Sequence, residues 1–257
     1  MELLMIILIV GILAALLLTG YSQVKARAQR IQCANNLNQI GLALQEFKTD
    51  HSFYPAEVDP IRWDEERNWR DALGNEMSIH HNVEYYPQGV WQCPATHRPL
   101  DSFWALHKNW GYNDYGYNVF GLGSRFLPNS MGLAEHWFNL PNTTAKPGSR
   151  VNEVAVADPS EMFAIGDEFF GGPDIIEDGL MFARASDSVI TAEGFPGYDS
   201  TQSTRRAYAR HQGKANVVFC DGHVGSPTLK FLFADLSDEA LSCWNRDHLP
   251  HRERLSP

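Results

Sequence analysis

The sequence predicts an α+β protein in which one long N-terminal helix packs on an antiparallel β-sheet head. Residues 3–18 carry no polar side chain, and residues 23–47 place apolar side chains mostly at three- or four-residue steps. Beyond residue 50 the chain becomes rich in proline, glycine and aromatic residues. We therefore expect a pilin-like helix over residues 1–49 and a soluble α+β head over residues 50–257.

The apolar run from Leu3 to Leu18 is extended by Thr19, Gly20 and Tyr21. About 20 such residues cross a bilayer as a helix, so a transmembrane segment is expected over about residues 3–21. A cleaved secretory signal is the alternative, but those signals begin with a basic region. This chain begins with Met1-Glu2, which favours a retained helix.

The same helix is expected to continue beyond the apolar run, because no proline occurs before Pro55. From Glu2 to about Phe47 it would be about 70 Å long at 1.5 Å per residue. Only the first half fits within a membrane. The amphipathic second half should pack against the head.

The overall charge excludes one class of partner. The 257 residues have a formal net charge of -10, whereas neutralising nucleic-acid phosphates requires concentrated positive charge. No nucleic-acid partner is expected.

The N-terminal segments carry a family resemblance. ELLMIILIVGILAALLL followed by KARAQRIQCANNLNQIGLALQEF resembles the N-terminal helix of type IV pilins and type II secretion pseudopilins. In that family a prepilin peptidase removes a basic leader, the new N-terminus is methylated, and a glutamate pairs with the terminal amine of a neighbouring subunit. Glu2 is the matching position. The leader, its glycine and the usual phenylalanine-led residues before the glutamate are missing here. Either the start is shortened or this copy cannot be processed, and we expect a shortened start.

The resemblance also implies a location and partners. It places the helix as a single pass in the cytoplasmic (inner) membrane and the head in the periplasm or an extracellular filament. The implied partners are the membrane, other pilin-like subunits bound through the N-terminal helix, and a secretion or pilus machinery.

The head is expected to contain short helices near residues 62–73 and 229–244 and a buried strand at Met162 to Ile165. Asp221-Gly222 stands between the β-rich segments VVFC and HV, which predicts a hairpin with a type I′ turn.

The hairpin carries a second resemblance. His211, nine residues and then Asp221-Gly222 resemble the H-X9-DG motif of a large set of prepilin-type proteins. Other recurring pieces of that set resemble RIQCANNLNQIGLAL, WQCPA, YGYN and DPSEMFAIGDE here. We expect His211, Asp221 and Gly222 to be structural, with His211 hydrogen-bonded towards Asp221. A metal or acid/base role for His211, Asp221 and His223 is the alternative.

No cofactor is expected, although calcium is left open because related secretion pseudopilins bind it in a head loop. The acidic residues examined for this role show no fixed ligand spacing, and we expect a solvated loop. These residues are Asp167, Glu168, Asp174, Glu177 and Asp178. Metal ligands remain unidentified. The four cysteines have no zinc-site spacing, and their pairing cannot be read from the sequence. They are Cys33, Cys93, Cys220 and Cys243.

The chain is expected to be non-enzymatic, because it shows no triad order, nucleophile elbow, phosphate loop or HExxH pattern. A pseudopilin-like subunit or assembly factor is the favoured function. The alternatives are a membrane-anchored binding module for glycans or proteins and an anchored hydrolase. Six tryptophans could form a sugar platform but more often fill a small core: Trp63, Trp69, Trp91, Trp104, Trp110 and Trp137.

Overall fold

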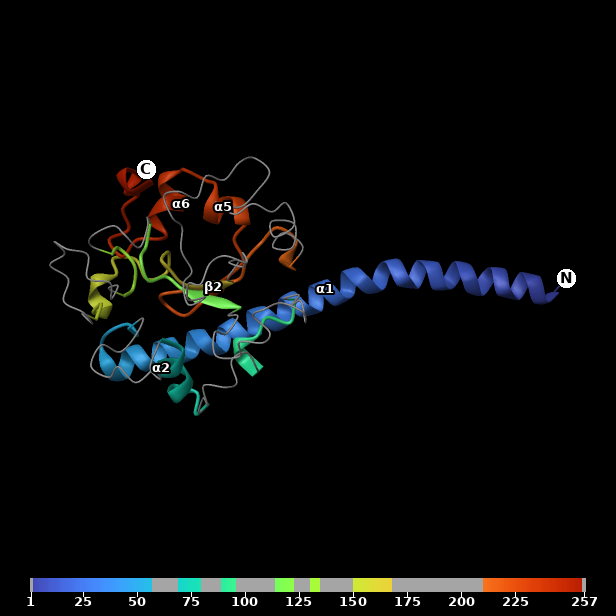
Figure 1. Ribbon diagram of the computed structural model, residues 1–257, viewed down its shortest axis with the longest axis horizontal. Coiled ribbons are helices and arrows are strands. Elements are labelled where there is room, and N and C mark those ends of the chain that lie inside the picture. Colours follow the sequence, from blue (N-terminus) through green and yellow to red (C-terminus); the bar gives the residue numbers. More distant parts are fainter. Residues whose placement is uncertain are drawn as a thin grey trace, which may run out of the picture.

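The computed structural model describes seven stretches of the chain: residues 2–56, 69–79, 89–95, 114–122, 130–134, 150–167 and 210–255. It is a mixed helix and sheet protein with a long helix, α1, that projects from one side of the head (Figure 1). The helices and 3-10 turns are α1 (Glu2–His51), α2 (Trp69–Glu76), η2 (Gly89–Trp91), η3 (Glu153–Ala155), α5 (Leu229–Phe233), α6 (Asp238–Ser242) and η4 (Arg252–Leu255).

Among the described residues, no helix is both long enough and apolar enough to cross a membrane.

The first half of α1 coincides with the segment 3–21 that was expected to span a bilayer. The side chains of residues 1–4, which include Glu2, and of residues 12–20 lie outside the described ones. The described side chains of residues 5–11 are exposed.

The second half of α1 belongs to the core of the head. Among the described side chains of the helix, Cys33 is the first that is buried, and Leu37, Ile40 and Leu44 follow it with no exposed area. These positions recur every three or four residues, so they form one apolar stripe on the helix. The expected packing of the amphipathic segment against the head is therefore present.

The sheet has four antiparallel strands in the order β1-β2-β3-β4. They are β1 (Tyr115–Tyr117), β2 (Phe163–Asp167), β3 (Val217–Phe219) and β4 (Val224–Gly225). Neighbouring residues of β3 point to opposite faces: Val218 joins the core on the α1 side, and Val217 joins the core formed with α5 and α6. The sheet thus lies between α1 and the C-terminal helices (Figure 1).

The hairpin between β3 and β4 confirms the expected turn position but not its type. A type I′ turn needs positive φ at both central residues. Here Gly222 has φ 92°, whereas Asp221 is not among the residues with positive φ. The Phe219 N–H donates to the His223 carbonyl, and the Gly222 N–H donates to the Phe219 carbonyl. This pattern is a three-residue loop whose glycine takes the left-handed position, so the type I′ prediction is wrong.

Residues 229–244, where short helical structure is expected, contain the two short helices α5 and α6. Thr228 caps α5 by accepting from the Phe231 N–H, and Ser237 caps α6 by accepting from the Ala240 N–H. Ser237 therefore begins a second helix that is separate from α5.

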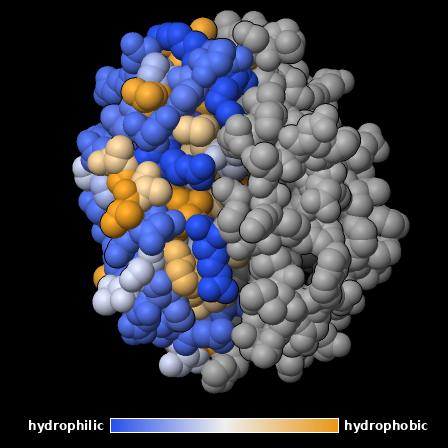
Figure 2. Space-filling view, turned by 90° about the vertical axis from the view of Figure 1, so that its left-hand side faces the viewer, coloured by the Kyte–Doolittle hydropathy of each residue, from blue (hydrophilic) through white to orange (hydrophobic). Residues whose placement is uncertain are grey.

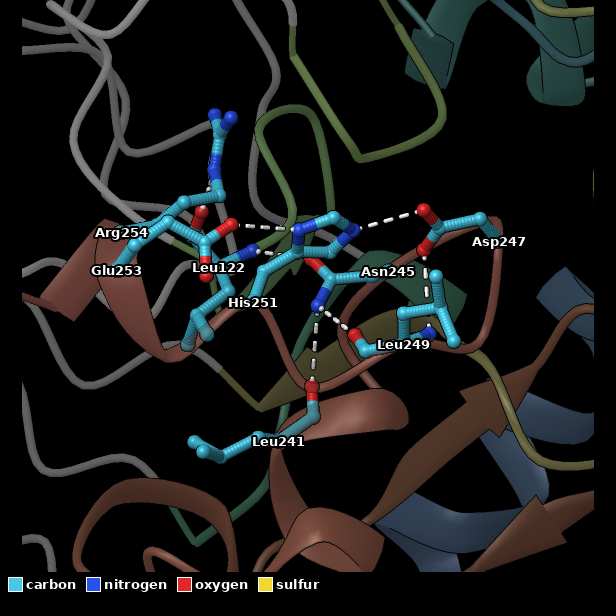
Figure 3. Close-up of polar contacts among 8 residues, drawn as sticks. All are labelled: Leu122, Leu241, Asn245, Asp247, Leu249, His251, Glu253 and Arg254. Atoms are coloured by element: carbon cyan, nitrogen blue, oxygen red, sulfur yellow. Dashed lines mark hydrogen bonds and ion pairs between the residues drawn. The ribbon is translucent and has the colours of Figure 1, made fainter.

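A buried amide joins the C-terminal segment to the head, and a histidine bridges two carboxylates within that segment (Figure 3). Asn245 donates to the carbonyl oxygens of Leu241 and Leu249, and its Oδ1 accepts from the Leu122 N–H. The His251 ring lies between two carboxylates, 2.7 Å from Asp247 Oδ2 and 2.8 Å from Glu253 Oε1. Carboxylates only accept, so this geometry requires the doubly protonated imidazolium.

The pKa of His251 is raised, because the hydrogen bonds to Asp247 and Glu253 outweigh partial burial, which lowers it. A raised pKa stabilises the fold fully below the unfolded-state value of about 6.5, and this contribution is lost as the pH rises through the folded-state pKa. We expect the stability advantage of the wild type over His251→Gln, at most about 1 kcal/mol for such exposed pairs, to shrink from acidic to alkaline pH. Thermal unfolding across that range measures it. An advantage that grows with pH would contradict it.

Candidate functional site

Within the part of the chain that the structure describes, two thiols, a carboxylate and an imidazole form a buried cluster of chemically active side chains. Cys33, Cys93 and Asp167 have no exposed area, and His211 is 1% exposed. One donor atom from each residue lies within 4.8 Å of all the others. Buried polar groups are costly unless partnered, so this arrangement calls for an explanation.

Four separate parts of the fold deliver these side chains. Cys33 comes from α1 at the point where the helix enters the core. Cys93 follows η2, and its backbone N–H donates to Asp114 Oδ2 at 2.8 Å. Asp167 is the last residue of β2, and His211 precedes β3, the strand beside β2.

Short contacts connect the side chains of the four residues to one another. The Cys33 thiol donates to Asp167 Oδ1 at 3.2 Å. His211 Nε2 lies 3.2 Å from Asp167 Oδ2 and 3.4 Å from Cys93 Sγ. All four cysteines of the chain are free and buried.

Two further groups orient the cluster from outside. The Tyr115 hydroxyl donates to Cys33 Sγ at 3.2 Å, and the Asn216 backbone N–H donates to Asp167 Oδ2 at 2.7 Å. Tyr115 is on β1 and Asn216 immediately precedes β3. The sheet therefore fixes both the sulfur of Cys33 and the carboxylate.

The electrostatics of the cluster favour charge on Cys93 and His211. The pKa of Cys93 is lowered to about 6, first by its hydrogen bond with Cys33 and then by the one with His211, against burial, which raises it. The pKa of His211 is raised to about 9: burial lowers it, but the hydrogen bonds to Asp167 and Cys93 raise it more. Burial raises the pKa of Cys33.

A cysteine beside a histidine and an aspartate could suggest a nucleophilic triad, but the geometry differs from one. In a triad the nucleophile and the carboxylate contact opposite nitrogens of the imidazole. Here Cys93 and Asp167 converge on the same atom, His211 Nε2, and Nδ1 has no hydrogen-bond partner within the described part of the chain. Four convergent, buried donor atoms could instead hold one metal ion.

The residues expected to act together at the H-X9-DG motif are separated. His211 belongs to the cluster, whereas Asp221 accepts from His223 Nδ1 at 2.6 Å in the hairpin. Among the described residues, no hydrogen bond joins His211 to Asp221, which corrects the expected contact. The reason is that β3 carries the chain away from His211 before the turn.

The turn at Asp221-Gly222, called the DG turn below, packs against α1. A Cβ on Gly41 of α1 would lie 2.7 Å from the Gly222 carbonyl oxygen, so the helix and the turn meet backbone to backbone. Next to this contact, Gln45 Nε2 and Lys48 Nζ both donate to the Cys220 carbonyl, at 3.1 and 2.6 Å. The turn is therefore a docking point for the helix.

The structure describes only some of the acidic residues and tryptophans that were considered as calcium or sugar ligands. Asp167 is fully buried in the cluster, so the expectation of a solvated acidic residue is wrong at this position. Trp69 and Trp91 are buried in the core, which is the core-filling role and leaves neither ring exposed as a sugar platform. The remaining acidic residues and tryptophans lie outside the described residues: Glu168, Asp174, Glu177, Asp178, Trp63, Trp104, Trp110 and Trp137.

Sequence reasoning did not bring the four cluster residues together, because Cys33 and Asp167 are 134 positions apart and Cys93 and His211 are 118 apart. A signal was nevertheless present. Each residue lies in a different segment that carried the resemblance: Cys33 in RIQCANNLNQIGLAL, Cys93 in WQCPA, Asp167 in DPSEMFAIGDE and His211 in the H-X9-DG motif.

Comparison with known protein families gives a match over part of the chain. A model of a family described as "Protein of unknown function (DUF1559)" matches residues 23–73, from the second half of α1 into α2. No curated protein and no solved structure matches the chain.

Proposed function

We propose that the chain is a non-enzymatic, pseudopilin-like subunit or assembly factor of a type II secretion or type IV pilus-like system. In this proposal residues 3–21 sit in the cytoplasmic (inner) membrane, and the head lies in the periplasm or in a filament outside the cell. The observation that carries the proposal is the division of α1 into a half buried in the head and a half that projects from it (Figure 1).

Near its start, the projecting half is apolar on every side over the described residues 5–10. Residues 5–10 are consecutive large apolar residues, each 55 to 68% exposed: Met5, Ile6, Ile7, Leu8, Ile9 and Val10. Successive helical residues are about 100° apart, so six of them surround the helix. A helix that is apolar all round needs an apolar environment, which lipid or the helices of neighbouring copies would provide.

The described surface of the head is more hydrophilic than residues 5–10 of α1. Figure 2 views the molecule from the end opposite the projecting helix, and its coloured part is mostly hydrophilic with small, scattered apolar areas. Between the two surfaces, Lys25 and Arg27 are exposed on α1. Basic side chains at the end of an apolar helix can reach the charged headgroup region. The positive-inside rule would place them on the cytoplasmic side, so the proposed orientation of the head rests on the family resemblance alone.

Two further considerations support an assembly role. The family whose model matches residues 23–73 is associated with pilin-like proteins. The proposal also gives Glu2 a use, because a carboxylate at the apolar end of α1 would gain a cationic partner only when the terminal amine of a neighbouring copy meets it.

Crosslinking in membranes tests this assembly. Single substitutions to cysteine at positions 5 to 10 are expected to give covalent dimers with a flexible bismaleimide, because neighbouring copies would pack through this half of α1. The native cysteines are buried, so they add little background. Val154→Cys is the matched control, since Val154 is 84% exposed on the head.

Adding Glu2→Ala to the most reactive variant should reduce its dimer yield while the head stays folded. If none of the six positions gave more dimer than Val154→Cys, helix-mediated assembly would be rejected.

A further inference from the structure

We propose that Cys33, Cys93, Asp167 and His211 form a structural zinc site that clamps α1 to the head. Two sulfurs, one imidazole nitrogen and one carboxylate oxygen are the ligand types that Zn²⁺ takes in proteins. Two sulfur ligands select against Ca²⁺ and Mg²⁺, which bind oxygen. This inference does not depend on filament assembly.

The spacing of the donor atoms fits a tetrahedral site. Bonds of about 2.3 Å to sulfur and about 2.0 to 2.1 Å to nitrogen or oxygen place neighbouring ligand atoms about 3.3 to 3.8 Å apart. The contacts of Cys33 Sγ with Asp167 Oδ1 and of Asp167 Oδ2 with His211 Nε2 are both 3.2 Å. Cys93 Sγ lies 3.4 Å from His211 Nε2. Small shifts would accommodate the ion.

The site is of the closed, structural kind. All four ligands come from the protein and all are buried, so no position is left for water or substrate. Groups outside the ligands orient them, as metal sites require: the Tyr115 hydroxyl donates to Cys33 Sγ, and the Asn216 N–H donates to Asp167 Oδ2.

The charge of such a site also fits its surroundings. Two thiolates, one carboxylate and a neutral imidazole would leave a Zn²⁺ complex with one net negative charge. Arg210, the residue before His211, lies close enough for the charges of Asp167 and Cys93 to act on its guanidinium group. A cation beside the complex would offset its charge in the low-dielectric core.

The location gives the ion a mechanical role. Cys33 is the residue at which α1 enters the core, and the other three ligands belong to the head. A bound ion would therefore tie the exit point of the helix to η2, β2 and β3 at once. The DG turn holds the same helix farther along, at Gly41.

Metal analysis of the full-length chain, purified in detergent under reducing conditions, tests the site. We expect about one zinc per chain, replaceable by Co²⁺ with the absorption bands of a tetrahedral site and of thiolate-to-cobalt charge transfer. Cys33→Ser and Cys93→Ser should each weaken Co²⁺ binding more than tenfold and reduce the charge-transfer band. Cys243→Ser is the matched control, because Cys243 is buried outside the cluster and its thiol donates to the Glu239 carbonyl, which a hydroxyl can also do.

The wild-type protein alone can overturn the proposal, whatever the folding of the variants. Reduced protein that holds no zinc and shows no thiolate-to-cobalt band would do so. So would peptide mapping of protein alkylated at cell lysis, if it showed Cys33 and Cys93 joined in a disulfide.

Discussion

Replacing Asn118 by alanine is expected to lower the free energy of unfolding by about 3 to 5 kcal/mol, because several buried hydrogen bonds are lost together. The side chain has no exposed area. Its Nδ2 donates to the carbonyl oxygens of Phe163 and Trp244, at 2.8 and 3.0 Å, and its Oδ1 accepts from the Gly121 N–H at 3.0 Å. It therefore joins β2 to the segment after α6, and the loss is a large part of the 5 to 15 kcal/mol typical of a domain.

Denaturant unfolding of the full-length chain measures this effect. Asn118→Asp should be comparably destabilising, since it keeps the size but removes the two N–H donors. Asn38→Ala, at an exposed position of α1, is the matched control and should change stability by less than about 0.5 kcal/mol. Equal stability of Asn118→Ala and Asn38→Ala would show that the buried amide does not hold these segments together.

Replacing Gly41 by alanine is expected to destabilise the protein by about 1 to 3 kcal/mol, even though alanine is the better helix former by about 1 kcal/mol. An added Cβ would lie 2.7 Å from the Gly222 carbonyl oxygen and 3.1 Å from Val218 Cγ1. The first of these is backbone, so the helix and the hairpin would have to move apart. Gly41→Leu should have a larger effect.

Gly11 provides the matched control on the same helix, because an added Cβ there would meet nothing within 4 Å. Gly11→Ala is expected to leave stability unchanged or to raise it. Thermal unfolding of both variants compares them. If Gly41→Ala were as stable as Gly11→Ala, the helix would not be held tightly against the DG turn.

The sequence predicts those parts of the fold that depend on local pattern. The three- and four-residue spacing of Leu37, Ile40 and Leu44 predicts the face of α1 that is buried. Asp221-Gly222 predicts the position of the hairpin, because glycine is needed where φ is positive. The turn type is less predictable, since the same dipeptide suits a two-residue loop and the three-residue loop that occurs here.

The buried cluster could not be assembled from sequence, because its members lie far apart in the chain and only tertiary packing joins them. The spacing of Cys33 and Cys93 matches no short zinc motif. The shared motif predicts a contact of His211 with Asp221, whereas the carboxylate partner of His211 is Asp167 on β2, the strand beside β3. The motifs identify these residues as candidates. The pairing of β2 with β3 determines that His211 contacts Asp167.

The continuity of α1 sets the rotational phase between the two ends of the molecule. The helix runs without a break from Glu2 to His51, and its second half is fixed in the core through Cys33 and Gly41. Successive residues of an α-helix are rotated by about 100° about the helix axis. One residue inserted before Cys33 would therefore rotate Met5 to Val10 by that angle relative to the head. Whatever binds the projecting end thereby also determines which side of the head is turned towards it.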